Sequence, residues 1–299
     1  MMAMSRKLKM RIIIPDDKDE VLELTEEIWD GRDYIPDYFD DWVKDEGFIC
    51  GVKDGEIVGL AKHTWHSDDI LWLEGLRVNP DYHGEGYGRA MIEGQVEYIN
   101  ENLNFRVARF LTSGDNTPVK KVVEDIGFDL KQKYDYLRFD DEDLEEETPP
   151  SEQEVKRVQV EERSEEVIRK VFSSQELDAN QGLYMEHWTA YPIDEELIRD
   201  RVKHGHCYSV RNENNGEIEA LMFMQVHKEY ESLSIAFACG TNEGMKELFK
   251  FSLRHCLQEE YERLRLKSAS NKVIEAAQEV GFSYSDHHSC TLVYEYEKD

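Results

Sequence analysis

The chain has 299 residues, of which 40% are hydrophobic and 11% aromatic, and this length is typical of about two globular domains. It carries 65 acidic against 36 basic side chains, a formal net charge of −29, which argues against nucleic acid as a partner because phosphate binding needs a clustered basic surface. No apolar run approaches the roughly 20 residues of a membrane helix, which predicts that the protein has no membrane partner. The five cysteines are scattered and form no C-x-x-C pair. They argue against a disulfide framework and a metal site, and they predict a cytoplasmic protein.

The first predicted elements are a strand and an aromatic segment. Ile12–Ile14 is the predicted first β-strand. Residues 29–42, WDGRDYIPDYFDDW, mix aromatic and acidic side chains, which predicts a pocket wall for a cation with an apolar body. Arg32 would hold a carboxylate there by a two-pronged contact. An amphipathic helix–loop whose aromatic residues form core is the equally weighted alternative.

A hairpin and a further strand follow. Asp54-Gly55 is the turn chemistry of a β-hairpin. The strand after it carries His63 and His66, which are candidates for relaying protons, although a lone histidine is more often structural or exposed. The next strand, from Leu71 to Val78, carries Glu74.

A glycine-rich turn is the most informative feature of the chain. After Asn79-Pro80, glycines alternate at positions 84, 86 and 88, and a helix opens at Arg89. Glycine lets the backbone take positive φ and approach a ligand closely, and the unpaired amides of a helix N-terminus attract anions. The pattern predicts an anion cradle for the phosphates of a nucleotide-like ligand. A connection that merely needs glycine is the alternative.

The spacing of these glycines narrows the ligand. It does not fit G-x-G-x-x-G, and the Lys-Ser/Thr pair of a P-loop is absent. A dinucleotide-dependent oxidoreductase is therefore disfavoured.

The rest of the first half and a linker follow. Asn116 begins a predicted helix, since Asn-x-Pro is typical of a helix start, and Gly127-Phe128 ends it. The acidic, proline-containing residues 141–155 predict a linker between domains at 1–140 and 156–299.

The second half repeats the first. Residues 215–221, NGEIEAL, match residues 54–60, DGEIVGL, and a helix again closes on Gly281-Phe282 before a last strand. Where the first half has its glycines, the second has residues 238–245, ACGTNEGM. The second copy is therefore predicted to keep the fold without the ligand, and binding of a ligand of its own is the alternative.

The glycine turn resembles motif A of the GNAT superfamily of acyl-CoA N-acyltransferases, R/Q-x-x-G-x-G/A after V-x-P, with His83 where Arg or Gln is usual. The resemblance implies an α/β GNAT fold in two tandem copies, each a mixed, mostly antiparallel sheet flanked by helices. It implies acetyl transfer from acetyl-CoA to a primary amine of a small molecule. The implied acetyl-CoA contacts are Leu76, Val78, His83, Gly84, Glu85, Gly86, Tyr87, Gly88, Arg89 and Asn116.

The resemblance also implies catalytic roles. Glu74 would act as the base that deprotonates the amine. Gly75 suits a bulge that splays the strand, and the amide of Leu76 would polarise the thioester carbonyl. The family's tyrosine acid is replaced by Val123, so Tyr134, Tyr136 or a residue of the second half would protonate the thiolate, or it leaves unprotonated.

A narrower resemblance concerns the acceptor. Asp33-Tyr34, Trp42 and residues 74–78, EGLRV, are similar to the histidine N-acetyltransferase family. This implies the α-amine of a free amino acid as acceptor, with Arg32, Tyr34 and His63 on the substrate side. A non-catalytic acyl-CoA sensor is the alternative, because Val123 replaces the tyrosine. Monomer and homodimer both stay open.

Overall fold

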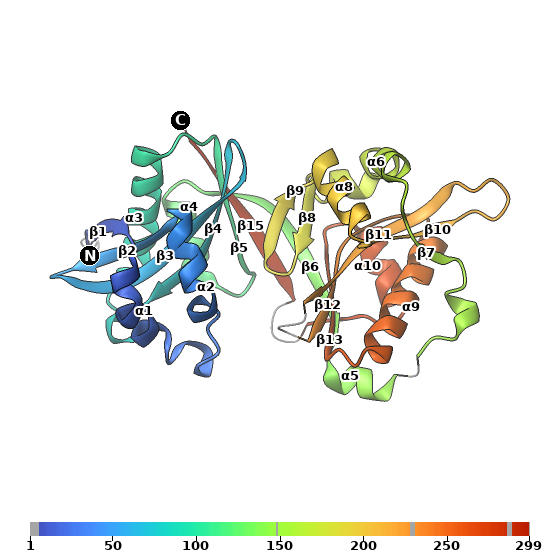
Figure 1. Ribbon diagram of the computed structural model, residues 1–299, viewed down its shortest axis with the longest axis horizontal. Coiled ribbons are helices and arrows are strands. Elements are labelled where there is room, and N and C mark those ends of the chain that lie inside the picture. The colour runs from blue at the N-terminus through green and yellow to red at the C-terminus, as the bar shows by residue number, and fades with distance from the viewer. Residues whose placement is uncertain (1–5, 148, 228–230, 286–288, 299) are drawn as a thin grey trace. The chain divides into compact units, whose positions relative to one another are not determined.

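The structure is a computed structural model that describes residues 6–147, 149–227, 231–285 and 289–298. The chain forms two compact units, which are described separately (Figure 1). Unit 1 comprises Met1–Phe110, Asn116–Asp129 and Tyr294–Asp299, and unit 2 comprises Leu111–Asp115 and Leu130–Val293. These units are defined by contacts in space, and each includes a segment from the other half of the sequence. They therefore do not test the predicted boundary between the two sequence repeats, and the linker at residues 141–155 stays a prediction.

Unit 1 is a mixed sheet with helices. Its elements are β1 (Lys9–Ile12), α1 (Lys18–Thr25), α2 (Ile35–Trp42), β2 (Phe48–Lys53), β3 (Glu56–Ser67), β4 (Ile70–Val78), α3 (Tyr87–Asn102), β5 (Val107–Ser113, its last three residues in unit 2) and α4 (Thr117–Asp125). The strand order is β1-β2-β3-β4-β5, antiparallel except for the parallel pair β4 and β5. The first strand begins earlier than predicted and ends at Ile12, because Pro15 opens a 3₁₀ turn.

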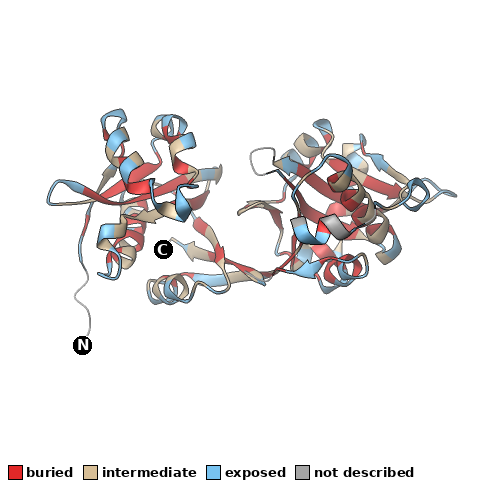
Figure 2. Ribbon diagram, turned by 90° about the horizontal axis from the view of Figure 1, so that it is seen from below, coloured by how far each residue is buried: buried red, intermediate tan, exposed pale blue. Residues whose placement is uncertain are grey.

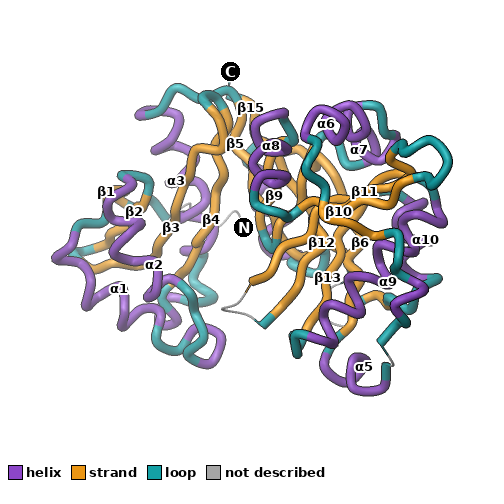
Figure 3. Tube along the Cα trace, turned by 45° about the vertical axis from the view of Figure 1, so that its right-hand side comes forward, coloured by secondary structure: helices purple, strands orange, loops and turns teal. Residues whose placement is uncertain are grey.

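The two faces of this sheet are covered by different helices (Figures 1 and 3). Alternate residues of a strand point to opposite faces, so Phe48 and Cys50 pack with α1 and α2, whereas Ile49 packs with α3. The strands of both units are mostly buried (Figure 2). No helix in the described ranges is long and apolar enough to span a bilayer.

The last strand of the chain completes unit 1. β15 (Cys290–Glu297) belongs to this unit from Tyr294 onward. The ring of Tyr294 stacks on Phe110 with centroids 5.6 Å apart, and Arg109 forms a largely buried ion pair of 2.6 Å with Glu295. Lys298 donates hydrogen bonds to two carbonyls at the end of α3, where a cation is favourable.

Unit 2 repeats this order of elements. It contains β6 (Asp129–Phe139), α5 (Asp141–Glu146), β7 (Val158–Val160), α6 (Ser164–Phe172), α7 (Gln175–Ala179), β8 (Leu183–Glu186), β9 (Thr189–Pro192), α8 (Glu195–Lys203), β10 (Cys207–Arg211), β11 (Ile218–His227), β12 (Ser232–Gly240), α9 (Asn242–Gln258), β13 (Arg263–Ser268), α10 (Asn271–Gln278) and β14 (Ser283–Tyr284). The main strand order is β6-β13-β12-β11-β10-β7, and β8 and β9 form a separate hairpin. Helix α9 joins the parallel strands β12 and β13, as α3 joins β4 and β5.

The predicted linker is partly structured. Residues 141–146 form α5, and Leu144 is buried in the core of unit 2.

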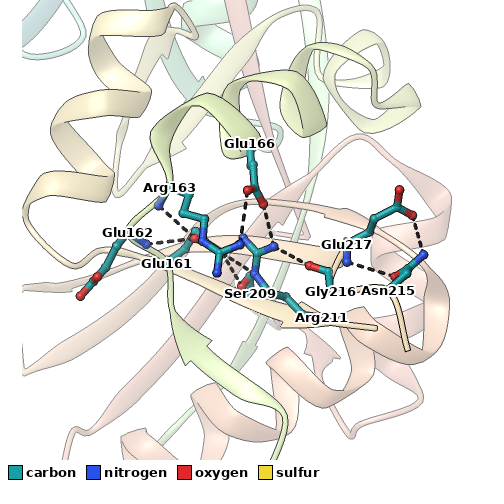
Figure 4. Close-up of polar contacts among 9 residues, drawn as sticks. All are labelled: Glu161, Glu162, Arg163, Glu166, Ser209, Arg211, Asn215, Gly216 and Glu217. Atoms are coloured by element: carbon teal, nitrogen blue, oxygen red, sulfur yellow. Dashed lines mark hydrogen bonds and ion pairs between the residues drawn. The ribbon is translucent and has the colours of Figure 1, made fainter. Parts of the chain in front are cut away.

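An ion-pair network holds another connection of this unit, the segment before α6 (Figure 4). Arg211 of β10 contacts the buried Glu161 at 2.6 Å, Glu166 of α6 at 2.7 Å and the carbonyl of Gly216 at 2.7 Å. This network ties the segment before α6 to the hairpin turn between β10 and β11.

Candidate functional site

Strand β4 separates from β5 partway along its length. The parallel pairing joins Ile70–Trp72 to Val107–Arg109, whereas β4 runs on to Val78. Among the described residues, no further pairing between the two strands extends this ladder. The end of β4 therefore leaves backbone groups and space beside the sheet.

A β-bulge lies in the separated part of β4. Leu60 pairs with Arg77 but Lys62 pairs with Glu74, so β4 has one residue more than β3 over this stretch. The predicted bulge at Gly75 is confirmed, since its φ is +64° and an added Cβ would lie 2.9 Å from the ring of Trp42.

This bulge sets which side chains face the same way. Glu74 and Arg77 are three residues apart, a spacing that puts side chains on opposite faces of a regular strand. Their partners Lys62 and Leu60 are two residues apart and share a face. The extra residue therefore brings Glu74 and Arg77 onto one face, the face of α1 and α2.

Glu74 has the environment of a proton acceptor. It is half-buried, and the hydroxyl of Thr64 donates a 2.7 Å hydrogen bond to its Oε1. Burial raises the pKa of Glu74, and the Thr64 hydrogen bond and the charge of Lys62 act against this rise. Lys62 is itself 2% exposed at its side chain and donates to the carbonyl of His63 at 3.0 Å. A carboxyl whose pKa is raised toward neutrality suits general-base chemistry.

His63 does not join Glu74. It follows Lys62 on β3, so its side chain points to the opposite face, where its ring lies 6.1 Å from that of Tyr98 in α3. Burial, followed by the charge of Lys62, lowers the pKa of His63 to about 4. The structure places this histidine in the packing of α3, and its predicted substrate role stays a prediction.

The predicted carboxylate-binding Arg32 is exposed. Its side chain is 79% accessible and lies 3.7 Å from Asp30. The arginine built into the site is Arg77, a member of the EGLRV motif for which the sequence predicts no role of its own. Arg77 donates to both oxygens of the buried Asp33, at 2.7 and 3.0 Å. Only the tertiary structure shows this pair.

Two aromatic rings cover Arg77. Its guanidinium carbon lies 4.2 Å from the centre of the Trp29 ring and 5.1 Å from that of Tyr34, distances typical of cation–π contacts. Tyr34 also packs edge-on against Trp42, with centroids 5.9 Å apart. Trp29 is 55% exposed, so part of this aromatic wall faces outward.

The glycine turn forms an open cradle at the start of α3. Gly84 and Gly86 have φ of +74° and +90°, and α3 begins at Tyr87, two residues before the predicted start. The first helical amide bond runs from Ala90 to the carbonyl of Gly86, so the preceding amides lack an intrahelical acceptor. A Cβ built on any of the glycines 84, 86 and 88 meets nothing within 4 Å. The glycines therefore leave space that no other described residue fills within 4 Å of the built Cβ atoms, which fits a diphosphate.

Side chains around this cradle are mostly paired. A ring nitrogen of His83 lies 2.9 Å from the carbonyl oxygen of Val78. A ligand that bonds to this carbonyl would share it with His83. Arg6 donates to the hydroxyl of Tyr87 at 2.9 Å and lies 3.5 Å from Glu85. Hydrogen bonds from Lys53 and Arg6 lower the pKa of Tyr87, with burial acting in the opposite direction.

Two further predicted residues have side chains with partners of their own. Arg89 pairs with Glu93 at 2.7 Å and with Asp125 of α4 at 2.9 Å. Asn116 accepts from the amide of Val119 and caps α4, as its sequence context predicts.

The proton donor proposed for the leaving group lies in unit 2. Tyr134 is fully buried there, and its hydroxyl donates to the carbonyl of Asn180 at 2.6 Å. Val123, at the position of the expected tyrosine, is 1% exposed. The role of Tyr134 as acid stays a prediction.

Comparison with known proteins places this site in a family. The family described as acetyltransferase (GNAT) matches residues 18–128, which contain β4, the bulge and the cradle. The first half of the chain contains a GNAT domain. This GNAT domain is similar to the histidine N-acetyltransferases of Oreochromis niloticus and Scomber australasicus, with 28% and 26% identity over 141 residues. The matched region is 46% of this chain and 41% of each relative, so it spans less than half of their length.

The GNAT fold covers both units. A GCN5-related N-acetyltransferase from Sphaerobacter thermophilus superimposes with a TM-score of 0.66 over 97% of this chain and 95% of its own, at 12% identity. A tandem GNAT protein from the clavulanic acid biosynthesis pathway gives a TM-score of 0.60 over 98% of this chain and 99% of its own, also at 12% identity. At such identities these likenesses show the fold alone, and the fold is that of tandem GNAT domains, as the sequence predicts.

Proposed function

We propose that unit 1 is an N-acetyltransferase that moves the acetyl group of acetyl-CoA to a primary amine of a small molecule. The observation that carries the proposal is the open glycine turn at the start of α3, next to a strand that separates from its neighbour and bears Glu74. The amides from Gly84 to Arg89 would hold the diphosphate. Backbone groups of Leu76 and Val78 would lie along the pantetheine arm.

The chain's own residues would prepare the amine and the thioester. Most biological amines are protonated at neutral pH, so attack needs a base, and Glu74 would accept that proton directly or through water. The amide of Leu76 would donate to the thioester oxygen as negative charge develops there. Bound acetyl-CoA supplies the activated acyl group.

The acceptor would be the α-amine of a free amino acid, with histidine as the first candidate. The similarity of the GNAT domain to histidine N-acetyltransferases supports this choice. The aromatic wall of Trp29, Tyr34 and Trp42 suits an acceptor with a planar or apolar body. The free cysteines of the described residues are consistent with a proposed cytoplasmic location.

Two measurements test the proposal. Titration calorimetry with coenzyme A should show binding, and a thiol-release assay with a panel of amino acids, polyamines and peptides should show turnover on amino acids. Turnover on polyamines or peptides alone would remove the amino-acid acceptor. Binding without turnover on any amine would favour the acyl-CoA sensor, for which the buried Val123 in place of tyrosine is the supporting observation.

A further inference from the structure

This inference rests on the proposed acetyl transfer and concerns a residue to which neither the sequence nor the family gives a role. We infer that Arg77 is a positioning residue that holds the acceptor-side loop, residues 28–34, against the bulge of β4. Through one guanidinium, Arg77 would fix both the wall that receives the amine and the strand that carries Glu74 and Leu76.

The first contact is the ion pair with the loop. Arg77 Nε and one terminal nitrogen donate to the two oxygens of Asp33, and the side chains are 10% and 1% exposed. This geometry needs the planar guanidinium, because a lysine ammonium offers a single point of contact. Asp33 also accepts from the amide of Ile35 at 3.1 Å, which joins the pair to the start of α2.

The second contact is with the bulge. The other terminal nitrogen of Arg77 donates to the carbonyl of Leu76 at 3.0 Å. Leu76 lies in the bulge, where the β3–β4 ladder is interrupted and the backbone has fewer bonds to hold it. The side chain of Arg77, the next residue, therefore adds a hydrogen bond at Leu76, whose amide is the proposed oxyanion donor.

The third contact is with a strained turn. Trp29, Asp30 and Gly31 have φ of +51°, +58° and +76°, and two of the three are not glycine. Consecutive left-handed residues persist only where the surroundings hold them. The packing of Arg77 against Trp29 at 4.2 Å supplies such support and leaves Trp29 partly exposed beside the site.

The bulge makes this arrangement effective. It puts Arg77 on the face of Glu74, and the guanidinium carbon of Arg77 lies 5.1 Å from the centre of the Tyr34 ring. An acceptor bound against the loop is thereby held at a fixed place relative to the proposed base. A misplacement of about 1 Å lowers the rate of a positioned reaction by about 100-fold.

Arg77→Lys and Arg77→Met test the inference by steady-state kinetics and calorimetry. Both should lower kcat by about 10- to 100-fold and raise KM for the amine, while Kd for coenzyme A changes less than about threefold. Arg106→Met is the matched control, because Arg106 forms an exposed pair of 2.6 Å with Asp69 at the other end of β4. Full activity of Arg77→Lys, or an equal loss in Arg106→Met, would overturn the inference.

A second readout does not depend on turnover. Hydrogen exchange of the amides of residues 28–34 should quicken at least tenfold in Arg77→Met and stay unchanged in Arg106→Met. If the Arg77 variants fail to fold, Trp29→Ala takes their place, since Trp29 is exposed and its loss should raise KM for the amine about threefold or more without lowering the melting temperature. An unchanged amine KM in that variant would contradict the inference. If the wild type acetylates no amine, the proposed function fails, whereas unchanged exchange in Arg77→Met refutes the inference alone.

Discussion

The two helices that follow the central strands, α3 in unit 1 and α9 in unit 2, begin in opposite ways. At α9 the side chain of Thr241 accepts from the amide of Gly244 at 3.2 Å, and Glu243 lies in the first turn. A Cβ at Gly244 would lie 2.7 Å from that of Ala220. At α3 no side chain of the described residues caps the first turn, and the glycines border open space.

The difference shows that glycine serves two purposes at the same place in the fold. In unit 2 glycine lets the helix pack closely on β11, and the hydroxyl of Thr241 takes up an amide of the first turn that an anion would otherwise bind. In unit 1 no described residue comes within 4 Å of a Cβ built on Gly88, and the φ of Gly88 is ordinary, so packing does not require glycine there. This contrast supports the hypothesis that only the first copy binds acetyl-CoA.

The strands that precede these helices, β4 in unit 1 and β12 in unit 2, also differ. Gly59 pairs with Val78, and Ala220, its counterpart in the repeat, pairs with Gly240. The ladder of unit 2 also carries a bulge, between Phe223 and Met224. Counting four residues back from Val78 and from Gly240, the position of Glu74 is occupied by Ala236. Unit 2 thus keeps the shape of the strand without its carboxylate.

The largest expected effect on binding comes from substitutions that test the contrast between the starts of α3 and α9. Gly88→Val should fill the cradle and weaken coenzyme A binding by at least about 100-fold, the loss of about 2.7 kcal/mol, with little change in melting temperature because the site is open. Gly244→Val should do the reverse, lowering stability by about 1–3 kcal/mol through overpacking and leaving binding unchanged. Calorimetry and thermal unfolding of both variants check this. Tight binding by Gly88→Val would mean that the turn is not the cradle.

The next effect concerns Glu74, which unit 2 lacks. Glu74→Gln should lower kcat/KM at neutral pH by about 10²- to 10⁴-fold without changing the affinity for acetyl-CoA. Because burial raises the pKa of Glu74, the wild-type rate should rise with pH through that raised pKa as the carboxylate forms. The variant should lose this limb of the profile. An identical pH profile in both proteins would remove Glu74 as the base.

The same raised pKa has a consequence for stability. Between the unfolded and the folded pKa of Glu74, the folded state binds more protons than the unfolded state, so this group's contribution to stability falls as pH rises through that window. The unfolding free energy of the wild type minus that of Glu74→Gln, measured in denaturant at several pH values, should fall as pH rises through this window. A difference that rises with pH would contradict a raised pKa of Glu74 in the folded state.

A further test, with a smaller expected effect on activity, compares the two arginines that join loops to strands. Arg211→Met removes the cation paired with the buried Glu161, which should cost about 3–5 kcal/mol of stability. Because Arg211 belongs to unit 2, KM for the amine and kcat of the folded protein should stay unchanged, in contrast to Arg77→Met. Chemical unfolding and kinetics on the same preparation measure both. A raised amine KM in Arg211→Met would show that the two arginines do not differ in role.

The smallest effect concerns the cap of α9. Thr241→Ala should lose about 1 kcal/mol, a fall in melting temperature of about 2–4 °C, with coenzyme A affinity unchanged. Thermal unfolding with and without coenzyme A checks this. New binding of coenzyme A to unit 2 in this variant would mean that the cap alone closes that helix start.

Local patterns in the sequence predicted much of this structure. The glycine turn, the cap at Asn116 and the repeat depend on a few neighbouring residues, and the bulge at Gly75 follows from the family resemblance. The structure has each of them. The GNAT fold follows from the same motifs. Turn and cap chemistry acts over short distances, which is why it can be read without a structure.

Contacts between distant residues could not be read in this way. Arg77 and Asp33 are 44 residues apart, and nothing near either one indicates its partner. The face of His63 depends on strand pairing, and the location of Tyr134 in unit 2 depends on where β6 joins a sheet. The role of Arg32 stays a prediction, and Arg77 was not predicted because in the sequence it lies far from the aromatic segment that it contacts.

The contribution of residues 294–298 to unit 1 bears on how the protein is made. The end of α3 and the ring of Phe110 are contacted by residues 294–298, which leave the ribosome only after all of unit 2. At a synthesis rate of about 5–20 residues per second, the delay is roughly ten to forty seconds. During that time the nascent chain carries an unfinished sheet margin that other chains can pair with. Maturation of the first copy is thus tied to completed translation of the second.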